Sequence, residues 1–342
     1  MNEHRETDSG IHKRLLLVLG MHRSGTSALT RGARVFGANF SGRLVDAQID
    51  NPKGFWEDAD LMALHQEIFE ALGMAWNRLT PVSPAEVRRL EALGFRGKAE
   101  QLLRTKMAGG GDIHAFKHPR MAKLFPFWKE VFATGDFEVI CLLAVRNPLS
   151  VARSLTSRNG TGKTYSCLMW LSHVIPSLFV PDPSRAIVVD YDRLLTNPSV
   201  EIQRIATRFG FSVDAAELEE YQNDFLAADL RHSTYSLEQL EQDSELPRLV
   251  AEVYRGLLDL ASDKISLDDP AVLEMFARWA GEFDDFYPFL KLIETTTAEL
   301  DRQAILLDNA VNDLGWRDAS LSWRLTKPLR SLTTLTRKFF AR

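Results

Sequence analysis

The feature that most constrains this chain is an apolar run that ends in a glycine-bracketed loop. Residues 15–19 read Leu-Leu-Leu-Val-Leu, which is too short for a helix of its own and typical of a buried strand. Gly20 and Gly25 then bracket a tight turn, and residues 26–31 begin a helical pattern. In such a strand–loop–helix unit, the loop N–H groups and the positive end of the helix dipole converge on one point. The segment therefore predicts an anion site.

The loop has the glycine spacing of the Walker A pattern but lacks its lysine. Thr26 stands where the lysine belongs, and the positive charge comes from Arg23, with His22 beside it. That difference argues against transfer of an ATP or GTP phosphate. A strand-to-helix turn that binds no ligand stays open as an alternative.

Three further strand patterns predict an α/β fold. Residues 113–117, 137–145 and 186–189 alternate with helical patterns, among them one charged helix over 84–106. This order predicts a P-loop-type three-layer domain, with a central parallel sheet flanked by helices and a C-terminal helical extension. Because ligands bind at the carboxyl ends of parallel strands, we expect four side chains to gather on one rim of the sheet: Arg23, Lys117, Arg146 and Tyr191.

A second motif indicates which anion the site takes. Arg146-Asn147-Pro148 follows a buried strand, and Ser154 lies eight residues after the arginine. This arrangement resembles the place where sulfotransferases hold the 3′-phosphate of 3′-phosphoadenosine 5′-phosphosulfate (PAPS). Residues 21–27 likewise resemble the family's 5′-phosphosulfate loop in its bacterial variant. Residues 116–120 and 190–198 are similar to two further family segments, so that four motifs in the family's order span residues 15–210.

The resemblance implies how PAPS would be held. Arg146 would bind the 3′-phosphate through its forked guanidinium, and Ser154 would add a hydroxyl donor. Tyr191 matches the tyrosine that contacts adenine, and Arg231, followed by His232, could close over the nucleotide from the C-terminal part. The 5′-phosphate would be bound by backbone N–H groups of the loop, those of Ser24, Gly25, Thr26 and Ser27.

The resemblance also implies a mechanism of in-line sulfonate transfer that needs no metal. Arg23 occupies the place of the family's catalytic lysine, and Lys117 is a second candidate for the cation at the sulfonate. Two residues compete for the role of general base. Glu57 resembles the glutamate of carbohydrate and bacterial members, whereas His118 is offset by one residue from the family's Lys-x-His spacing. We favour Glu57.

Composition excludes several other classes. The 342 residues carry a net charge of −5, which argues against a general nucleic-acid binder. Two cysteines allow no disulfide framework, and the eight histidines show no metal-site spacing. We expect a chain without a signal peptide or an 18-residue apolar span, and therefore one that is cytoplasmic or at most peripheral on the inner membrane face.

The last fifty residues change character. Ile293, Leu300, Leu307, Leu314 and Leu321 recur every seven residues, which predicts a short coiled coil that would allow a homo-oligomer through 291–321. A long helix packed on its own domain is the alternative. Residues 320–342 combine basic and apolar side chains, as a peripheral membrane or partner helix does. The predicted organisation is a disordered 1–13, a sulfotransferase domain over 14–290, and this extension over 291–342.

The sequence therefore predicts a PAPS-dependent sulfotransferase that acts on a hydroxyl of a carbohydrate or glycolipid and releases 3′,5′-adenosine bisphosphate. The carbohydrate acceptor rests on a short likeness of 322–330 to the tails of bacterial surface-polysaccharide glycosyltransferases. Trp56, Trp76 and Trp170 could stack on sugars or simply pack in the core. Two alternatives stay open: a P-loop small-molecule or nucleoside kinase, and a non-catalytic scaffold with a degenerate nucleotide site.

Overall fold

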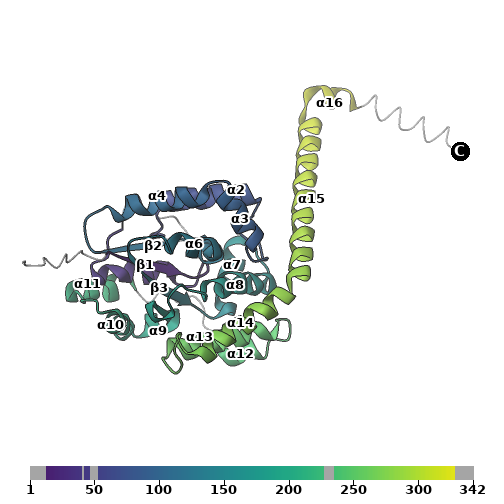
Figure 1. Cartoon of the computed structure of the whole chain (residues 1–342). Helices are drawn as coiled ribbons and strands as arrows, with labels where there is room; N and C mark the ends of the chain where they lie inside the picture. Colours follow the sequence, from purple (N-terminus) through teal and green to yellow (C-terminus); the bar gives the residue numbers. More distant parts are fainter. Residues whose placement is uncertain (1–12, 41, 47–52, 227–234, 328–342) are drawn as a thin grey trace, which may run out of the picture. The chain divides into compact units, whose positions relative to one another are not determined.

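Four parallel strands form the sheet: β1 (Arg14–Leu19), β2 (Ile113–Lys117), β3 (Glu138–Val145) and β4 (Ala186–Asp190), in the order β2-β1-β3-β4 (Figure 1). Helices flank it, so the predicted α/β class with a central parallel sheet is confirmed. The computed structural model describes residues 13–40, 42–46, 53–226 and 235–327, and it divides the chain into two units, 1–287 and 288–342. The predicted disordered segment 1–13 lies almost wholly outside the described residues.

The sheet is buried on both faces because each strand is apolar at successive positions. Leu16 pairs with Ala115 on one side and with Ile140 on the other, in register along β1. One face packs against the first helix after β1 and against the second helix after β4, in a cluster that includes Leu16, Val18, Leu29, Ile202 and Ile205. The alternate residues of β1 point to the opposite face and are equally buried.

The helices follow the strands in a βα alternation. Around β1 and β2 they are α1 (Thr26–Gly32), α2 (Ala59–Leu72), α3 (Pro84–Ala92), α4 (Phe95–Met107), α5 (Pro119–Lys123) and α6 (Phe125–Phe132). After β3 and β4 they are α7 (Pro148–Asn159), α8 (Lys163–Ser177), α9 (Tyr191–Thr196), α10 (Pro198–Phe209) and α11 (Ala215–Glu220). The first unit ends with α12 (Leu237–Glu241), α13 (Arg248–Ala261) and α14 (Pro270–Asp285).

The single helix predicted over 84–106 is wrong, because two helices occupy this stretch. The break falls at Gly94, which has a φ of 80° and serves as the N-cap of α4. A left-handed residue cannot continue a helix, and glycine adopts that conformation without a steric penalty.

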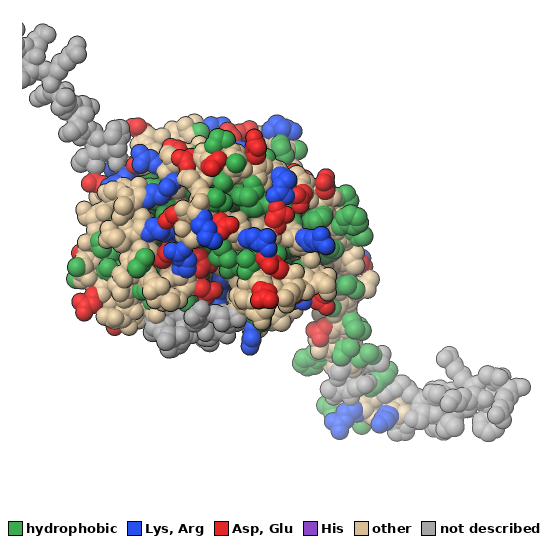
Figure 2. Space-filling view, turned by 90° about the horizontal axis from the view of Figure 1, so that it is seen from below, with side chains coloured by type: hydrophobic (Ala, Val, Ile, Leu, Met, Phe, Trp, Pro, Cys, Tyr) green, Lys and Arg blue, Asp and Glu red, His purple; other side chains and the backbone are tan. Residues whose placement is uncertain are grey.

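The second unit is dominated by α15 (Tyr287–Ala319), followed by α16 (Leu321–Leu325). Apolar side chains of the predicted heptad stripe are exposed along α15, among them Leu300, Leu307 and Leu314. Figure 2 shows hydrophobic side chains (green) at the surface of this helical unit. No helix among the described residues is long and apolar enough to span a bilayer. Most of the basic end, 328–342, lies outside the described residues, and its membrane contact stays a prediction.

Candidate functional site

The candidate site lies at the carboxyl ends of β1 and β3. The two strands are neighbours in the sheet, yet the chain leaves β1 toward β2 on one side before returning to β3 on the other. In open parallel sheets this reversal opens a crevice in which ligands bind. Arg23 follows β1 and Arg146 follows β3, so both predicted anion-binding arginines stand at this switch point.

Four predicted residues are joined into what we call the arginine cluster: Arg23, Arg146, Ser154 and Tyr191. Arg23 donates from Nε to the hydroxyl of Ser154 on α7, at 2.8 Å. Arg146 donates from Nη1 to the carbonyl of Arg23, at 3.2 Å, and its guanidinium lies 4.9 Å from the centre of the Tyr191 ring. Two guanidinium groups, a hydroxyl and an aromatic ring are thus held together by residues that follow β1, β3 and β4.

The shape of the loop depends on two left-handed residues. Gly25 has a φ of 82°, and a Cβ there would lie 2.0 Å from Cδ2 of Tyr191. Arg23 has a φ of 67°, a conformation that side chains of its size rarely adopt. Strain of this kind persists where surrounding contacts enforce it, and it concentrates at functional sites. Here the contacts with Ser154 and Arg146 are among those that hold Arg23 in place.

Two polar atoms of the loop are buried and make no hydrogen bond with any described residue. They are the hydroxyl of Ser24, a residue with no exposed surface, and Nε2 of His22. A buried hydroxyl without a partner costs free energy, so such a group in a loop of this kind fits a ligand that supplies the missing partner.

Across the loop lies a second group, which we call the glutamate cluster: Glu57, Lys117, His118 and Ser27. Lys117 Nζ forms an ion pair with Glu57 Oε1 at 2.8 Å and donates to the Ser27 hydroxyl at 3.2 Å. His118 Nε2 lies 3.6 Å from the other carboxylate oxygen of Glu57. The two competing candidates for the general base are therefore neighbours. Lys117 is the cation that forms the ion pair with Glu57.

Burial controls the protonation of the basic groups here. It lowers the pKa of Lys117, although the Glu57 carboxylate opposes the shift. Burial, with His65 and His22 next in effect, holds the pKa of His118 well below its usual range. Burial and the nearby Lys117 lower the pKa of His22 to about 3. Burial also lowers the pKa of His65 to about 3. The imidazoles of His22, His65 and His118 are therefore neutral at pH 7.

Trp56 places Glu57. Its φ is 56°, and its indole donates to the carbonyl of Lys53 at 3.0 Å while its ring packs edge-on against Phe40 and Phe225. A bulky residue in this conformation is a backbone outlier, and it immediately precedes the carboxylate.

The other two tryptophans that were considered for sugar stacking differ in burial. Trp170 is fully buried, whereas Trp76 is half-buried and lies edge-on to His22, with 6.0 Å between the ring centres.

Two residues of the site's surroundings were not predicted. His65 and Trp128 extend the glutamate cluster inward, through a contact between His65 and His118. The sequence offered one indication of this extension: His65 shares the apolar, buried face of α2 with Leu61, Leu64 and Ile68. The predicted Arg231, with His232, lies outside the described residues.

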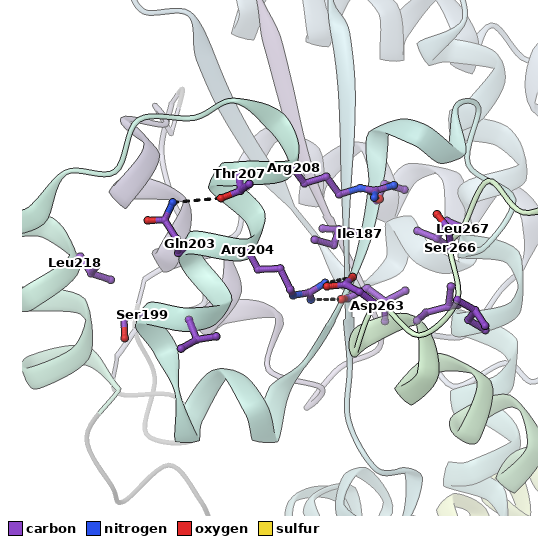
Figure 3. Close-up of a pocket in the computed structure, with 15 residues that line it drawn as sticks. Ile187, Ser199, Gln203, Arg204, Thr207, Arg208, Leu218, Asp263, Ser266 and Leu267 are labelled. Atoms are coloured by element: carbon purple, nitrogen blue, oxygen red, sulfur yellow. Dashed lines mark hydrogen bonds and ion pairs between the residues drawn. The ribbon is translucent and has the colours of Figure 1, made fainter.

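The cavity drawn in Figure 3 is separate from the candidate site. It measures about 880 Å³ and is lined from β4, α10, α11, the end of α13 and the segment after it. None of its lining residues is a predicted site residue. Arg204 and Arg208 donate there to the carbonyls of Val188 and Ala186 and so cover the open edge of the sheet.

Among the described residues no group of three His, Cys, Asp or Glu side chains could hold a metal ion.

No family model matches the chain, and no curated protein matches it. The solved structures that resemble it include several sulfotransferases. One is the sulfotransferase domain of the olefin synthase of Synechococcus PCC 7002, with 14% identity over 71% of this chain and 95% of that chain, at a TM-score of 0.40. Sulfotransferases of Mycobacterium tuberculosis and Mycobacterium avium each share 16% identity over 72% of this chain, covering 77% and 76% of their own chains, at TM-scores of 0.40 and 0.41.

Proposed function

We propose that this chain is an enzyme that moves the sulfonate group of PAPS to a hydroxyl of a carbohydrate or glycolipid. The observation that carries the proposal is the joining of Arg146, Arg23 and Ser154 at the crevice between β1 and β3. A forked guanidinium with a hydroxyl beside it suits a phosphate group, and the adjoining loop offers the buried Ser24 hydroxyl to a second one. Two phosphate sites side by side are what a doubly phosphorylated adenosine requires.

PAPS supplies the sulfonate and leaves as 3′,5′-adenosine bisphosphate. The chain's own part is to position the acceptor and to take its proton. As the acceptor oxygen bonds to sulfur, the bond from sulfur to the 5′-phosphate oxygen breaks, and Glu57 accepts the hydroxyl proton. Lys117 holds Glu57 from one side and reaches the loop through Ser27, so it stands between base and phosphate site. Positioning and charge stabilisation account for most of the catalysis in such transfers.

The carbohydrate acceptor is supported by Trp76. This side chain is half-buried and lies edge-on to His22 of the loop, so it could offer an aromatic face to an acceptor beside the loop. Trp170 is fully enclosed and cannot stack on a sugar.

The proposal is tested by calorimetric binding of 3′,5′-adenosine bisphosphate and of 5′-AMP to the full chain. We expect the bisphosphate to bind tighter, and Arg146→Ala to remove about a hundredfold of its affinity while 5′-AMP changes little. Arg153→Ala, an exposed arginine next to Ser154 on α7, is the matched control and should leave both affinities unchanged. Stabilisation by Mg-ATP but not by the bisphosphate would favour the kinase instead, and bisphosphate binding without transfer to any acceptor would favour the scaffold.

We further propose that α15 pairs in parallel with α15 of a second copy. Its apolar stripe is exposed, and the carboxylates of Glu294, Asp301 and Asp308 flank that stripe at the same heptad position. In an antiparallel pair these carboxylates would face one another, whereas in a parallel pair Asp301 and Asp308 face uncharged residues. Light scattering should show a dimer that Leu307→Asp dissociates. Leu306→Asp, an equally exposed neighbour outside the stripe, should leave it intact.

A further inference from the structure

A row of four side chains leads from the protein core to Glu57. Trp128 on α6 donates from its indole N–H to Nε2 of His65 on α2, at 2.8 Å. His65 Nδ1 lies 2.7 Å from His118 Nδ1, and His118 Nε2 lies 3.6 Å from Glu57 Oε2. Trp128 and His65 have no exposed surface, and His118 is 3% exposed. Each ring is therefore shielded from bulk water and contacts its neighbours in the row.

The chemistry of the first member fixes the protonation of the others. An indole N–H can only donate, so His65 must accept at Nε2 and carries its single proton on Nδ1. That proton is donated to His118 Nδ1, which must therefore be unprotonated. The proton of His118 then sits on Nε2, the atom nearest the Glu57 carboxylate. A charged His65 would present two donors and could not accept from Trp128.

We infer that Trp128 and His65 are positioning residues that hold His118 in its Nε2–H tautomer, so that it presents a donor rather than a lone pair to Glu57. This inference rests on the proposed function for its catalytic meaning. With Lys117 on one carboxylate oxygen and an N–H beside the other, Glu57 is oriented from both sides. His118 has no lone pair left on that side with which to take the acceptor's proton, which leaves that task to Glu57.

The tautomer itself is the first test and needs no activity. The ring nitrogens of His118 in the ¹⁵N-histidine-labelled full chain are assigned by their loss in His118→Gln. At pH 7 we expect a protonated Nε2 and an unprotonated Nδ1. The opposite tautomer, or a doubly protonated ring, overturns the inference even if the chain proves to be an active sulfotransferase. Conversely, absence of sulfonate transfer with the expected tautomer rejects the proposed function and leaves the proton arrangement standing.

Variants separate positioning from mere structural support. Trp128→Phe keeps an aromatic ring but removes the donor, so His118 should populate both tautomers and kcat should fall about ten- to a hundredfold with KM for PAPS unchanged. Trp279→Phe is the matched control, since Trp279 is equally buried and its indole donates to Glu252 at 3.1 Å, outside the row. It should change neither kcat nor the tautomer.

Position 65 supplies a rescue experiment. Glutamine can accept at its carbonyl and donate from its amide, and so can reproduce the order of donor and acceptor that His65 provides. His65→Gln should therefore retain the Nε2–H tautomer of His118 and most of kcat, whereas His65→Leu should lose both. Equal activity of the two variants, both folded by thermal melting, would contradict a positioning role.

Discussion

The contact between Gly25 and Tyr191 makes a quantitative prediction for the loop. A Cβ at position 25 would lie 2.0 Å from Cδ2 and 2.5 Å from Cγ of the Tyr191 ring, which is itself only 7% exposed and cannot swing into solvent. Gly25→Ala therefore carries two costs. The left-handed backbone costs about 1 kcal/mol for a residue with a side chain, and forcing extra volume into a packed site costs about 2 kcal/mol more. We expect a loss of about 3 kcal/mol in the free energy of unfolding.

Gly37→Ala is the matched control for this experiment. Gly37 has a φ of 74°, close to the 82° of Gly25, but a Cβ at position 37 would meet no atom of the described residues within 4 Å. The substitution should cost only the backbone part, about 1 kcal/mol. Urea unfolding of both variants measures the difference, and calorimetry should show that only Gly25→Ala also weakens binding of 3′,5′-adenosine bisphosphate. Equal destabilisation by the two substitutions would refute the packing argument.

Two further predictions concern buried charges near the site. Lys106 is 6% exposed and pairs with Asp58 at 2.7 Å, so Lys106→Met should leave a buried carboxylate without its cation and cost about 3 kcal/mol in urea unfolding. Burial raises the pKa of Asp190 to about 6 from its ordinary 3.8, so the folded chain holds this proton more tightly than the unfolded chain does. The contribution of Asp190 to stability is therefore greatest below pH 4 and is lost as the pH rises through 6, by up to about 3 kcal/mol. In Asp190→Asn the free energy of unfolding should not show this decrease between pH 4 and pH 7, as measured by urea unfolding at each pH.

The strands were predictable because each is a short apolar run bounded by polar or turn residues. The predicted strand over 113–117 has the bounds of β2, and those over 137–145 and 186–189 differ from β3 and β4 by one residue. The helix over 84–106 was wrong because one glycine inside a helical pattern does not reveal its φ. Only the tertiary structure shows Gly94 to be left-handed.

The outer part of the site was predictable from topology, and the inner part was not. Arg23 and Arg146 follow neighbouring strands, and the rule that ligands bind at the carboxyl ends brought them together in advance. His65 and Trp128 belong to two helices whose packing no local pattern specifies. Their contact with His118 depends on how α2 and α6 meet, and that is decided by the whole core.

The missing Walker lysine has a physical explanation in the packing of Thr26. This side chain is only 4% exposed, and its methyl group lies 3.0 Å from where a Cβ would stand on Gly20. Position 26 is therefore buried close to Gly20, at the end of β1, and leaves little room for a longer side chain. The loop's cations come instead from outside the helix: Arg23 reaches toward Ser154, and Lys117 reaches Ser27 from β2. Cations thus lie on both sides of the loop, Arg23 with Arg146 on one and Lys117 on the other, where the Walker arrangement would place a single lysine at the helix start.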